Sequence, residues 1–364
     1  MPRLRPSLLW KACRISPNLA RLLPVCRDIP SALNELRWIR EHVQSLPAPN
    51  NVRYHDRQHR DTLARQLCIR RGLGEPLQFL LGTQPFGDLD ILCRPGVLIP
   101  RPETEAYTIH LADCIRSGGL PALGSSHDII DRGGLRILDI CTGSGCIPLL
   151  LGARLARRGL VSEVRGVDIS PKALRLSRDN TTRNRELLRN CEPKFQKLDL
   201  FATEDAYTAS SLAEDGSWDV VTCNPPYISD AGFARDTTRS VRNFEPKNAN
   251  VPEERDLGGL YDAVRPEDVF YARVLDMCRE YLRPRVVFFE VGDLEQAKRV
   301  ATMALQDHVQ VEIWRDLPDV IPDSDDDGLA SMSIDGVTVA IKGSGHGRGV
   351  LIQYPGEAGR QRHS

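Results

Sequence analysis

The feature that most constrains the fold of this chain is the alternation of short apolar runs with longer helix-patterned segments after residue 135. An apolar run rich in β-branched residues, such as 218–223, is typical of a buried strand. Strands that alternate with helices in this way form a mostly parallel sheet covered on both faces. The sequence therefore predicts an α/β domain. Its expected strands are 135–140, 163–168, 194–198, 218–223, 285–290, 309–314 and 349–353, and its expected helices are 147–158, 171–189, 262–281 and 293–306.

A different pattern precedes this domain. Leu33, Leu36, Ile39 and Val43 recur at helical spacing, and a second helix is expected at about 57–71. These segments predict a small helical domain.

Two apolar runs then flank Arg94-Pro95-Gly96, which predicts a β-hairpin. Two further segments, 116–134 and 318–347, are rich in glycine, serine or acidic residues. We expect both of them to be loops.

Charge is distributed unevenly along the chain. Residues 1–27 contain six basic residues and no acidic one, while the whole chain carries a net charge of −1, so residues 28–364 carry −7. A basic, acid-free segment with interspersed leucines is typical of a mitochondrial transit peptide. The alternative is a basic arm that binds nucleic acid or a ribosome. We favour targeting, and the acidic remainder argues against non-specific binding to DNA.

Neither the cysteines nor the acidic residues indicate a metal site. The ten cysteines are scattered and form no Cys-x-x-Cys pair, so a reducing compartment is expected. Asp323, Asp325 and Asp327 match the opening of a calcium loop, but its twelfth position is Ile334 instead of glutamate. No segment approaches the length of a transmembrane helix.

The segment after the first α/β strand is a candidate ligand loop. Glycines there let a backbone approach a ligand, and open α/β sheets bind ligands at the carboxyl ends of their strands. Pro148 replaces the third glycine of a dinucleotide fingerprint, and the Asp139 carboxylate would repel a pyrophosphate. This combination disfavours NAD and favours a cofactor that carries an ammonium group, such as S-adenosylmethionine. The candidate cofactor residues here are Asp139, Cys141, Thr142, Gly143, Ser144 and Gly145.

Acidic residues also end the next two strands. Asp168 is placed to accept hydrogen bonds from ribose hydroxyls, although it could instead cap the helix after Pro171. Asp199 and Leu200 could hold an adenine ring, and Asp199 could equally be a simple turn residue.

The fourth strand ends in Asn224-Pro225-Pro226-Tyr227. Two prolines in a row fix the backbone and carry no N–H group, so nearby carbonyls are free to accept hydrogen bonds from a ligand. The cluster suits an amino group on a planar molecule. Pro-Pro-Tyr also occurs in ordinary turns, and the motif alone does not distinguish a turn from a ligand-binding cluster.

The chain resembles the HemK/PrmC family of S-adenosylmethionine-dependent methyltransferases, which modify glutamine in class I peptide release factors. The resemblance covers roughly 76–315 and departs from the family pattern at Cys141, where glycine is usual. It rests on Pro76–Gly82, Val97–Glu105, Asp139–Gly145, Asn224–Tyr227, Phe244-Glu245-Pro246 and Phe289–Gly292.

The resemblance implies a Rossmann-like class I methyltransferase sheet, joined through a β-hairpin to a small N-terminal helical domain. It further implies that residues 224–227 hold the substrate glutamine and that Asn224 also lines the cofactor site. The expected protein is a monomeric enzyme of the mitochondrial matrix that binds a release factor and neither DNA nor a membrane. The expected organisation is a transit peptide at 1–27, a substrate-recognition domain at 28–83, a hairpin and linker at 84–130, a methyltransferase domain at 131–356 and a tail at 357–364.

Two alternatives remain open. The same acceptor cluster fits the exocyclic amine of adenine, so an adenine-N6 nucleic-acid methyltransferase is possible; such an enzyme must extrude its base or act on a single strand. The other alternative is a non-catalytic protein that retains the fold and binds only the cofactor.

Overall fold

The computed structural model divides the described residues between two compact units. Neither the aspartates at 323–327 nor the expected tail at 357–364 falls within the described residues. Of the helices in the described part of the chain, none has both the length and the apolar character needed to cross a lipid bilayer. The described residues are 4–47, 56–202, 212, 216–257, 261–307, 309–321 and 328–355.

The smaller unit is helical, as the sequence predicts. Its α12 comes from far along the chain, and Ser240 Oγ in that helix donates a hydrogen bond to the Gly74 carbonyl over 2.8 Å. The described helices of this unit are α1 (Pro6–Ile15), α2 (Pro17–Cys26), α3 (Ile29–Ser45), α4 (Asp56–Gly72), α5 (Leu77–Leu81) and α12 (Arg239–Phe244).

The expected targeting segment contributes to the core of this unit. Ser16 caps α2 and Pro17 stands at its first position, where a missing N–H costs nothing. The side chains of α1 and α2 pack in one cluster with those of α3 and α4. A targeting role for residues 1–27 stays a prediction. The fully buried side chains that α1 and α2 supply are Ala12, Leu19, Leu22 and Leu23.

Polar contacts fix the helices that follow. The Asp28 carboxylate caps α3 by accepting from the Ser31 N–H over 2.7 Å. The Arg71 guanidinium on α4 donates two bonds of 2.7 Å to the Glu35 carboxylate on α3. A two-pronged pair of this kind restricts orientation as well as distance, so it sets how α4 lies against α3.

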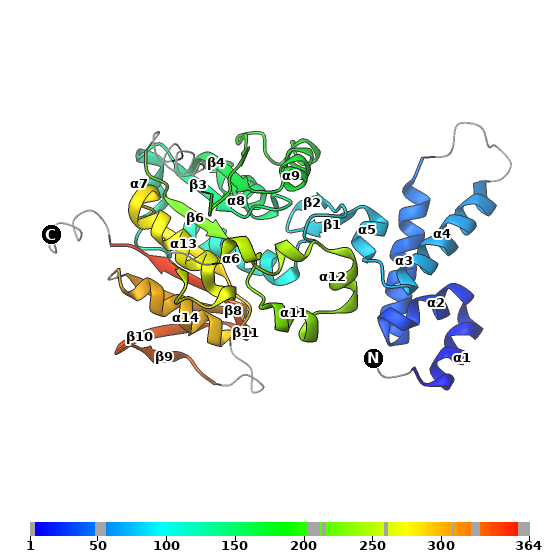
Figure 1. Ribbon diagram of the computed structural model, residues 1–364. Coiled ribbons are helices and arrows are strands. Elements are labelled where there is room, and N and C mark those ends of the chain that lie inside the picture. The colour runs from blue at the N-terminus through cyan, green and yellow to red at the C-terminus, as the bar shows by residue number, and fades with distance from the viewer. Residues whose placement is uncertain are drawn as a thin grey trace. The chain divides into compact units, whose positions relative to one another are not determined.

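The larger unit is built on a nine-stranded sheet within the described residues, with the order β5-β4-β3-β6-β7-β11-β8-β10-β9 (Figure 1). Strands β5, β4, β3, β6 and β7 are parallel, whereas β11 runs antiparallel to β7 and β8. The strands are β3 (Leu135–Ile140), β4 (Val161–Asp168), β5 (Lys194–Lys197), β6 (Val220–Cys223), β7 (Val286–Glu290), β8 (Gln310–Leu317), β9 (Ser331–Ile334), β10 (Val337–Lys342) and β11 (Ser344–Gln353).

Alternate residues of each central strand enter the two faces of the sheet. In β3, Leu138 and Ile140 join one apolar cluster, and Leu135 and Ile137 join the other. Helices α13 and α14 cover the first face, while α6 and α8 cover the second. This confirms the predicted α/β class. The remaining elements of the unit are α6 (Pro102–Ser117), α7 (Ser126–Asp131), α8 (Cys146–Ala156), α9 (Pro171–Arg183), α11 (Asp230–Asp236), η1 (Lys247–Ala249), η2 (Glu254–Asp256), η4 (Pro266–Asp268), α13 (Val269–Met277), η5 (Cys278–Leu282) and α14 (Leu294–Leu305).

The structure differs from the sequence predictions in four places. The expected loop 116–134 contains the end of α6 and all of α7. The hairpin exists, but its strands are β1 (Thr83–Phe86) and β2 (Leu89–Leu92), so its turn precedes Pro95-Gly96. Part of the expected linker 84–130 is α6, whose residues pack on the sheet. The expected loop 318–347 contains β9, β10 and the start of β11.

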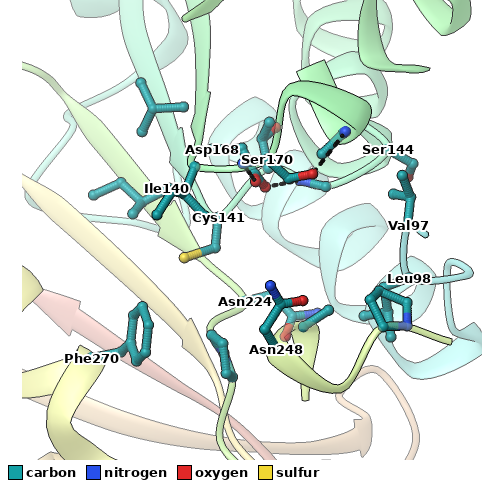
Figure 2. A pocket seen from close by; sticks show the side chains of 18 of the residues that line it. Val97, Leu98, Ile140, Cys141, Ser144, Asp168, Ser170, Asn224, Asn248 and Phe270 are labelled. Carbon is teal, nitrogen blue, oxygen red and sulfur yellow. Dashed lines mark hydrogen bonds between the residues drawn. The ribbon is translucent and has the colours of Figure 1, made fainter. Parts of the chain in front are cut away.

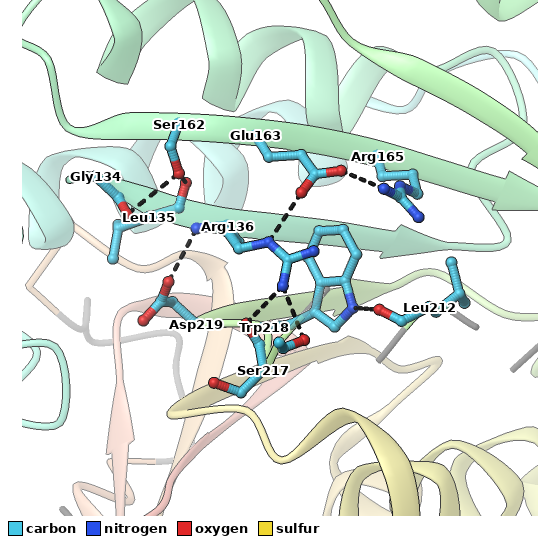
Figure 3. A network of polar contacts seen from close by, with 11 residues as sticks. Gly134, Leu135, Arg136, Ser162, Glu163, Arg165, Leu212, Ser217, Trp218 and Asp219 are labelled. Atoms are coloured by element: carbon cyan, nitrogen blue, oxygen red, sulfur yellow. Dashed lines mark hydrogen bonds and ion pairs between the residues drawn. The ribbon is translucent and has the colours of Figure 1, made fainter. Parts of the chain in front are cut away.

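A polar network closes the end of the sheet where β3, β4 and β6 begin (Figure 3). Arg136 Nε donates to Glu163 over 2.8 Å, and its guanidinium carbon lies 4.4 Å from the Trp218 ring centroid. Arg165 also pairs with Glu163 and lies over the same ring at 5.2 Å. The indole N–H of Trp218 donates to the Leu212 carbonyl over 2.7 Å. Trp218 therefore anchors three strand starts at once.

We expect Trp218→Ala to lower the free energy of unfolding by about 3–5 kcal/mol, because a fully buried indole and its hydrogen bond are removed. Trp10→Ala is the matched control, since Trp10 is 61% exposed; its effect should stay within about 0.5 kcal/mol. Urea unfolding of both variants measures the difference. Equal losses would contradict the anchoring role.

Candidate functional site

A cavity lies at the carboxyl ends of the parallel strands, where open α/β sheets bind ligands. It encloses about 1130 Å³ of space not filled by atoms, part of it open to solvent. In Figure 2, Asp168 and Ser170 lie at one end, and Asn224 and Phe270 lie below them. The lining residues come from 96–101, Thr104, 140–144, 146–147, 167–170, Ala173, 198–201, Asn224, Pro226, Pro246, 248–249, Glu253, 255–256 and Phe270.

The glycine-rich segment forms a tight loop between β3 and α8. Gly143 and Gly145 have φ values of +54° and +79°, a region that favours glycine. A Cβ on Gly145 would lie 3.0 Å from the Ser177 Cβ, whereas a Cβ on Gly143 would meet no protein atom within 4 Å. Gly145 is therefore required by packing, and Gly143 leaves open space beside the cavity.

Asp168 holds this loop in place. Its two carboxylate oxygens accept from the N–H groups of Gly143 and Ser170, both over 2.8 Å. Burial raises the pKa of the Asp168 carboxyl, and the two backbone bonds oppose that shift. Each oxygen has a second lone pair, so ribose hydroxyls can still donate to it. The alternative capping role is wrong, because Ser170 caps α9.

Asp139 lies beneath the loop and does not line the cavity. Its side chain is fully buried, and its Oδ1 accepts from Thr222 Oγ1 over 2.6 Å. Burial raises the pKa of Asp139 to about 7, although the Thr142 and Thr222 hydroxyls oppose the shift. The carboxyl therefore supports the loop from below.

We expect Asp139→Asn to flatten the dependence of stability on pH. The pKa of Asp139 is raised in the folded state, so its contribution to stability is present below pH 4 and is lost as pH rises through 7. For the wild type this loss amounts to at most about 4 kcal/mol. Urea unfolding of wild type and variant between pH 4 and 8 tests this, and parallel pH profiles would contradict it.

An apolar slot follows β5. Leu200 and Phe270 are nearly fully buried, and the Phe201 and Phe270 rings meet edge to face with centroids 4.9 Å apart. Asp199 accepts from Arg255 over 2.7 Å and from the Phe201 N–H over 3.2 Å. A planar ring such as adenine fits between these apolar side chains, and the Asp199–Arg255 ion pair lies beside it.

The Asn-Pro-Pro-Tyr segment follows β6 directly. Asn224 Nδ2 donates to Glu290 Oε2 over 2.8 Å, and the Tyr227 hydroxyl donates to Glu290 Oε1 over 3.0 Å. Gln296 Nε2 donates to the Tyr227 carbonyl over 3.1 Å. With its nitrogen held by a carboxylate, Asn224 has its oxygen left as a hydrogen-bond acceptor.

The structure thus brings most predicted residues to one cavity. Asp139, Gly145, Pro225 and Tyr227 are the predicted residues that are not among its lining. Their direct roles stay predictions. Glu290 contacts both Asn224 and Tyr227, although the sequence alone did not mark it as a site residue. The predicted residues that do line the cavity are Cys141, Thr142, Gly143, Ser144, Asp168, Asp199, Leu200, Asn224 and Pro226.

The cavity fits S-adenosylmethionine. Its described lining carries the carboxylates of Asp168, Asp199, Glu253 and Asp256 against two guanidinium groups, which suits a ligand bearing a sulfonium and an ammonium. The open space beside Gly143 lets a ligand approach the backbone. The apolar slot accepts an adenine ring, and the Asp168 oxygens accept ribose hydroxyls. When bound, this cofactor supplies an electrophilic methyl group.

Comparison with known proteins gives two kinds of match. A family model described as RNA methyltransferase matches residues 90–291. The mitochondrial MRF1 N(5)-glutamine methyltransferase MTQ1 of Saccharomyces cerevisiae is 32% identical, over 86% of this chain and 83% of its own length. The probable MRF1 mitochondrial N(5)-glutamine methyltransferase of Schizosaccharomyces pombe is 31% identical, over 87% and 93%. A release factor glutamine methyltransferase of Nitratidesulfovibrio vulgaris is 32% identical, over 69% and 72%.

The two yeast relatives cover so much of the chain that they match parts of both units, and all three names describe glutamine methylation. The predicted resemblance to the HemK/PrmC family is confirmed by their identity and coverage. The chain therefore belongs to the release factor glutamine methyltransferase family, whose enzymes take their methyl group from S-adenosylmethionine.

Proposed function

We propose that this protein transfers a methyl group from S-adenosylmethionine to the side-chain amide nitrogen of the glutamine in the Gly-Gly-Gln motif of a mitochondrial class I release factor. The observation that carries the proposal is the position of Asn224. This acceptor side chain lines the same cavity as the glycine loop and Asp168. Relatives named for release factors and for mitochondrial MRF1 support the substrate.

The chemistry requires positioning more than proton transfer. A carboxamide nitrogen is a poor nucleophile, because its lone pair is delocalised into the carbonyl. Asn224 Oδ1 and the Pro225 carbonyl accept the two N–H bonds of the substrate amide and aim its nitrogen at the methyl group, while Tyr227 packs on the amide plane. Orientation and fixed dipoles of this kind supply several kcal/mol of barrier lowering. The new N–CH₃ bond would replace the S–CH₃ bond of the cofactor, which would leave as the neutral thioether, and the cationic amide would then lose one proton to water.

The test is incubation with labelled cofactor and either the release factor or its Gln→Ala variant. We expect label in the wild-type factor and none in the variant. Equal labelling of both factors would overturn the glutamine assignment.

A second candidate is a nucleic-acid adenine methyltransferase. The description of the matching family model favours it, and the acceptor at Asn224 suits an exocyclic amine as well as an amide. RNA and DNA oligonucleotides in the same labelling assay decide between the two. Label in an oligonucleotide, with none in the release factor, would promote this candidate. We expect no methyl transfer to DNA.

We further propose that the protein is a monomer of the mitochondrial matrix, to which residues 1–27 direct it. The names of the yeast relatives support a mitochondrial location. Because α1 and α2 supply core side chains, we expect the mature protein to retain them. Sequencing the amino terminus of protein isolated from mitochondria, and light scattering of the purified enzyme, test these points.

A further inference from the structure

Glu290 is a buried carboxylate beside the reactive cavity, at the end of β7. The β6–β7 register pairs Cys223 with Phe289. The next residue on each chain segment is Asn224 and Glu290, so these two lie side by side at the carboxyl end of the sheet. The Glu290 residue is only 2% exposed. A carboxylate in this position needs partners, because an unpaired buried charge is costly.

Among the described residues, the side chains that hydrogen-bond to this carboxylate are all donors. Thr104 Oγ1 donates to Oε2 over 2.6 Å, and Asn224 Nδ2 donates to the same oxygen over 2.8 Å. The Tyr227 hydroxyl donates to Oε1, and the Tyr107 hydroxyl also bonds to the group. An ionised carboxylate only accepts hydrogen bonds. The group of Asn224 that faces Glu290 is therefore the amide NH₂.

We infer that Glu290 is a positioning residue for methyl transfer: its carboxylate fixes the side-chain amide of Asn224 with Oδ1 toward the substrate nitrogen. This inference rests on the proposed function. The substrate amide presents N–H donors, so an acceptor must face it. If the Asn224 amide rotated by half a turn, two donors would meet and the nitrogen would be pushed away from its reactive position.

A purely structural role would be to tie α6 to the strand ends through Thr104. The two roles differ in what they affect. If Glu290 only connected α6 to β7 through Thr104, losing that hydrogen bond would lower stability and weaken cofactor binding by disturbing the whole cavity. Loss of the fixed acceptor lowers kcat and leaves cofactor affinity and folding nearly unchanged.

The ionised form of Glu290 is required, so acid should abolish turnover. Burial raises the pKa of Glu290, while the hydroxyl of Thr104, the Arg348 charge and the two tyrosine hydroxyls oppose the shift. Removing the Thr104 donor therefore raises the pKa of Glu290. The fall of kcat on the acid side of its pH profile, here called the acid limb, then moves to higher pH. The titratable groups that face Glu290 from packed elements are Tyr107 on α6, Cys146 on α8, Tyr227 after β6, Tyr271 on α13 and Arg348 on β11.

The test is Glu290→Gln in the full chain, assayed with labelled cofactor and release factor. Glutamine offers one acceptor oxygen and one NH₂ donor where glutamate offers two acceptor oxygens, so the Asn224 amide is no longer held in a single orientation. We expect kcat to fall about 100-fold, the size of effect seen when one fixed dipole is lost, with cofactor affinity changed by less than about threefold. Glu163→Gln is the control: it removes a partly buried carboxylate at the other end of the sheet, and kcat should persist. A Glu290→Gln enzyme with wild-type kcat would overturn the inference.

If Glu290→Gln does not fold, Thr104→Val provides a second test, because it removes one hydrogen-bond donor to Glu290 and leaves the carboxylate in place. We expect it to shift the acid limb upward, and Thr104→Ser to restore the wild-type limb. An unshifted limb in Thr104→Val contradicts the inference.

A readout without substrate separates this inference from the proposed function. The side-chain amide protons of Asn224, observed by nuclear magnetic resonance in the cofactor-bound enzyme, should exchange slowly in wild type and rapidly in Glu290→Gln. If wild type does not label the release factor, the proposed function fails, and this exchange measurement alone judges Glu290. Equal exchange in both proteins refutes the positioning role.

Discussion

Asn224→Ala should reduce methyl transfer by about 10²–10³-fold or more while S-adenosylmethionine still binds. The substitution removes the fixed acceptor that holds the substrate nitrogen, and losses of single fixed dipoles in active sites have this size. The cofactor retains the loop at Gly143, Asp168 and the apolar slot. Single-turnover kinetics with the release factor measure the first quantity, and equilibrium binding of the cofactor measures the second.

The control measurement for this variant is its affinity for the cofactor. If Asn224→Ala loses turnover and cofactor affinity by the same factor, Asn224 acts chiefly as a cofactor ligand. Turnover within about tenfold of wild type would contradict an acceptor role altogether.

Deletion of residues 1–27 should unfold the helical unit. It removes three fully buried leucines, each worth about 2 kcal/mol, and the sum of about 6 kcal/mol equals the whole stability of many domains. We therefore expect a protein that has lost helix signal, aggregates and no longer methylates the release factor. Circular dichroism and urea unfolding of the deleted and full chains measure this.

Two point variants locate the cause of that effect. Leu22→Ala should cost about 2–5 kcal/mol, because a core leucine becomes a cavity. Ile15→Ala lies on α1 but replaces a side chain that is 57% exposed, so its cost should stay within about 0.5 kcal/mol. A deleted protein as stable as the full chain would instead mark residues 1–27 as a removable leader.

The central sheet could be predicted because its strands are buried on both faces. Runs such as 286–289 are apolar throughout, and a short apolar run bounded by turn residues and rich in β-branched or aromatic residues favours a buried strand. The predicted strands match β3–β8 and β11 to within a few residues, apart from the start of β11. The glycine loop was also predictable, because glycines allow the positive φ angles that Gly143 and Gly145 adopt in this turn.

The missed elements lie where composition gives the opposite signal. β10 lies one strand in from the edge of the sheet and alternates buried Val339 and Ile341 with more exposed neighbours, and the acidic stretch before it favoured a loop. The helix α6 begins at Pro102, within the segment 84–130 that was predicted to be hairpin and linker, although proline is well tolerated at the first position of a helix. The first two helices were hidden by a composition typical of targeting segments.

The site was predictable as a set of residues, and its internal contacts were not. Asp139 precedes the glycine loop in sequence, yet the strand direction buries it below the loop. Glu290 belongs to the Phe289–Gly292 motif, but its contact with Asn224 depends on β6 and β7 being neighbours in the sheet. Strand order joins residues that are 66 positions apart, and a single sequence does not give that order.

The most direct test of the account is to locate the transferred methyl group. The release factor is incubated with enzyme and cofactor, digested, and its Gly-Gly-Gln peptide is fragmented in a mass spectrometer. We expect one added methyl group on the side-chain nitrogen of the glutamine, and none when the Asn224→Ala variant is used in place of the wild-type enzyme. A methyl group on any other residue, or an unmodified peptide beside a methylated nucleic acid, would contradict it.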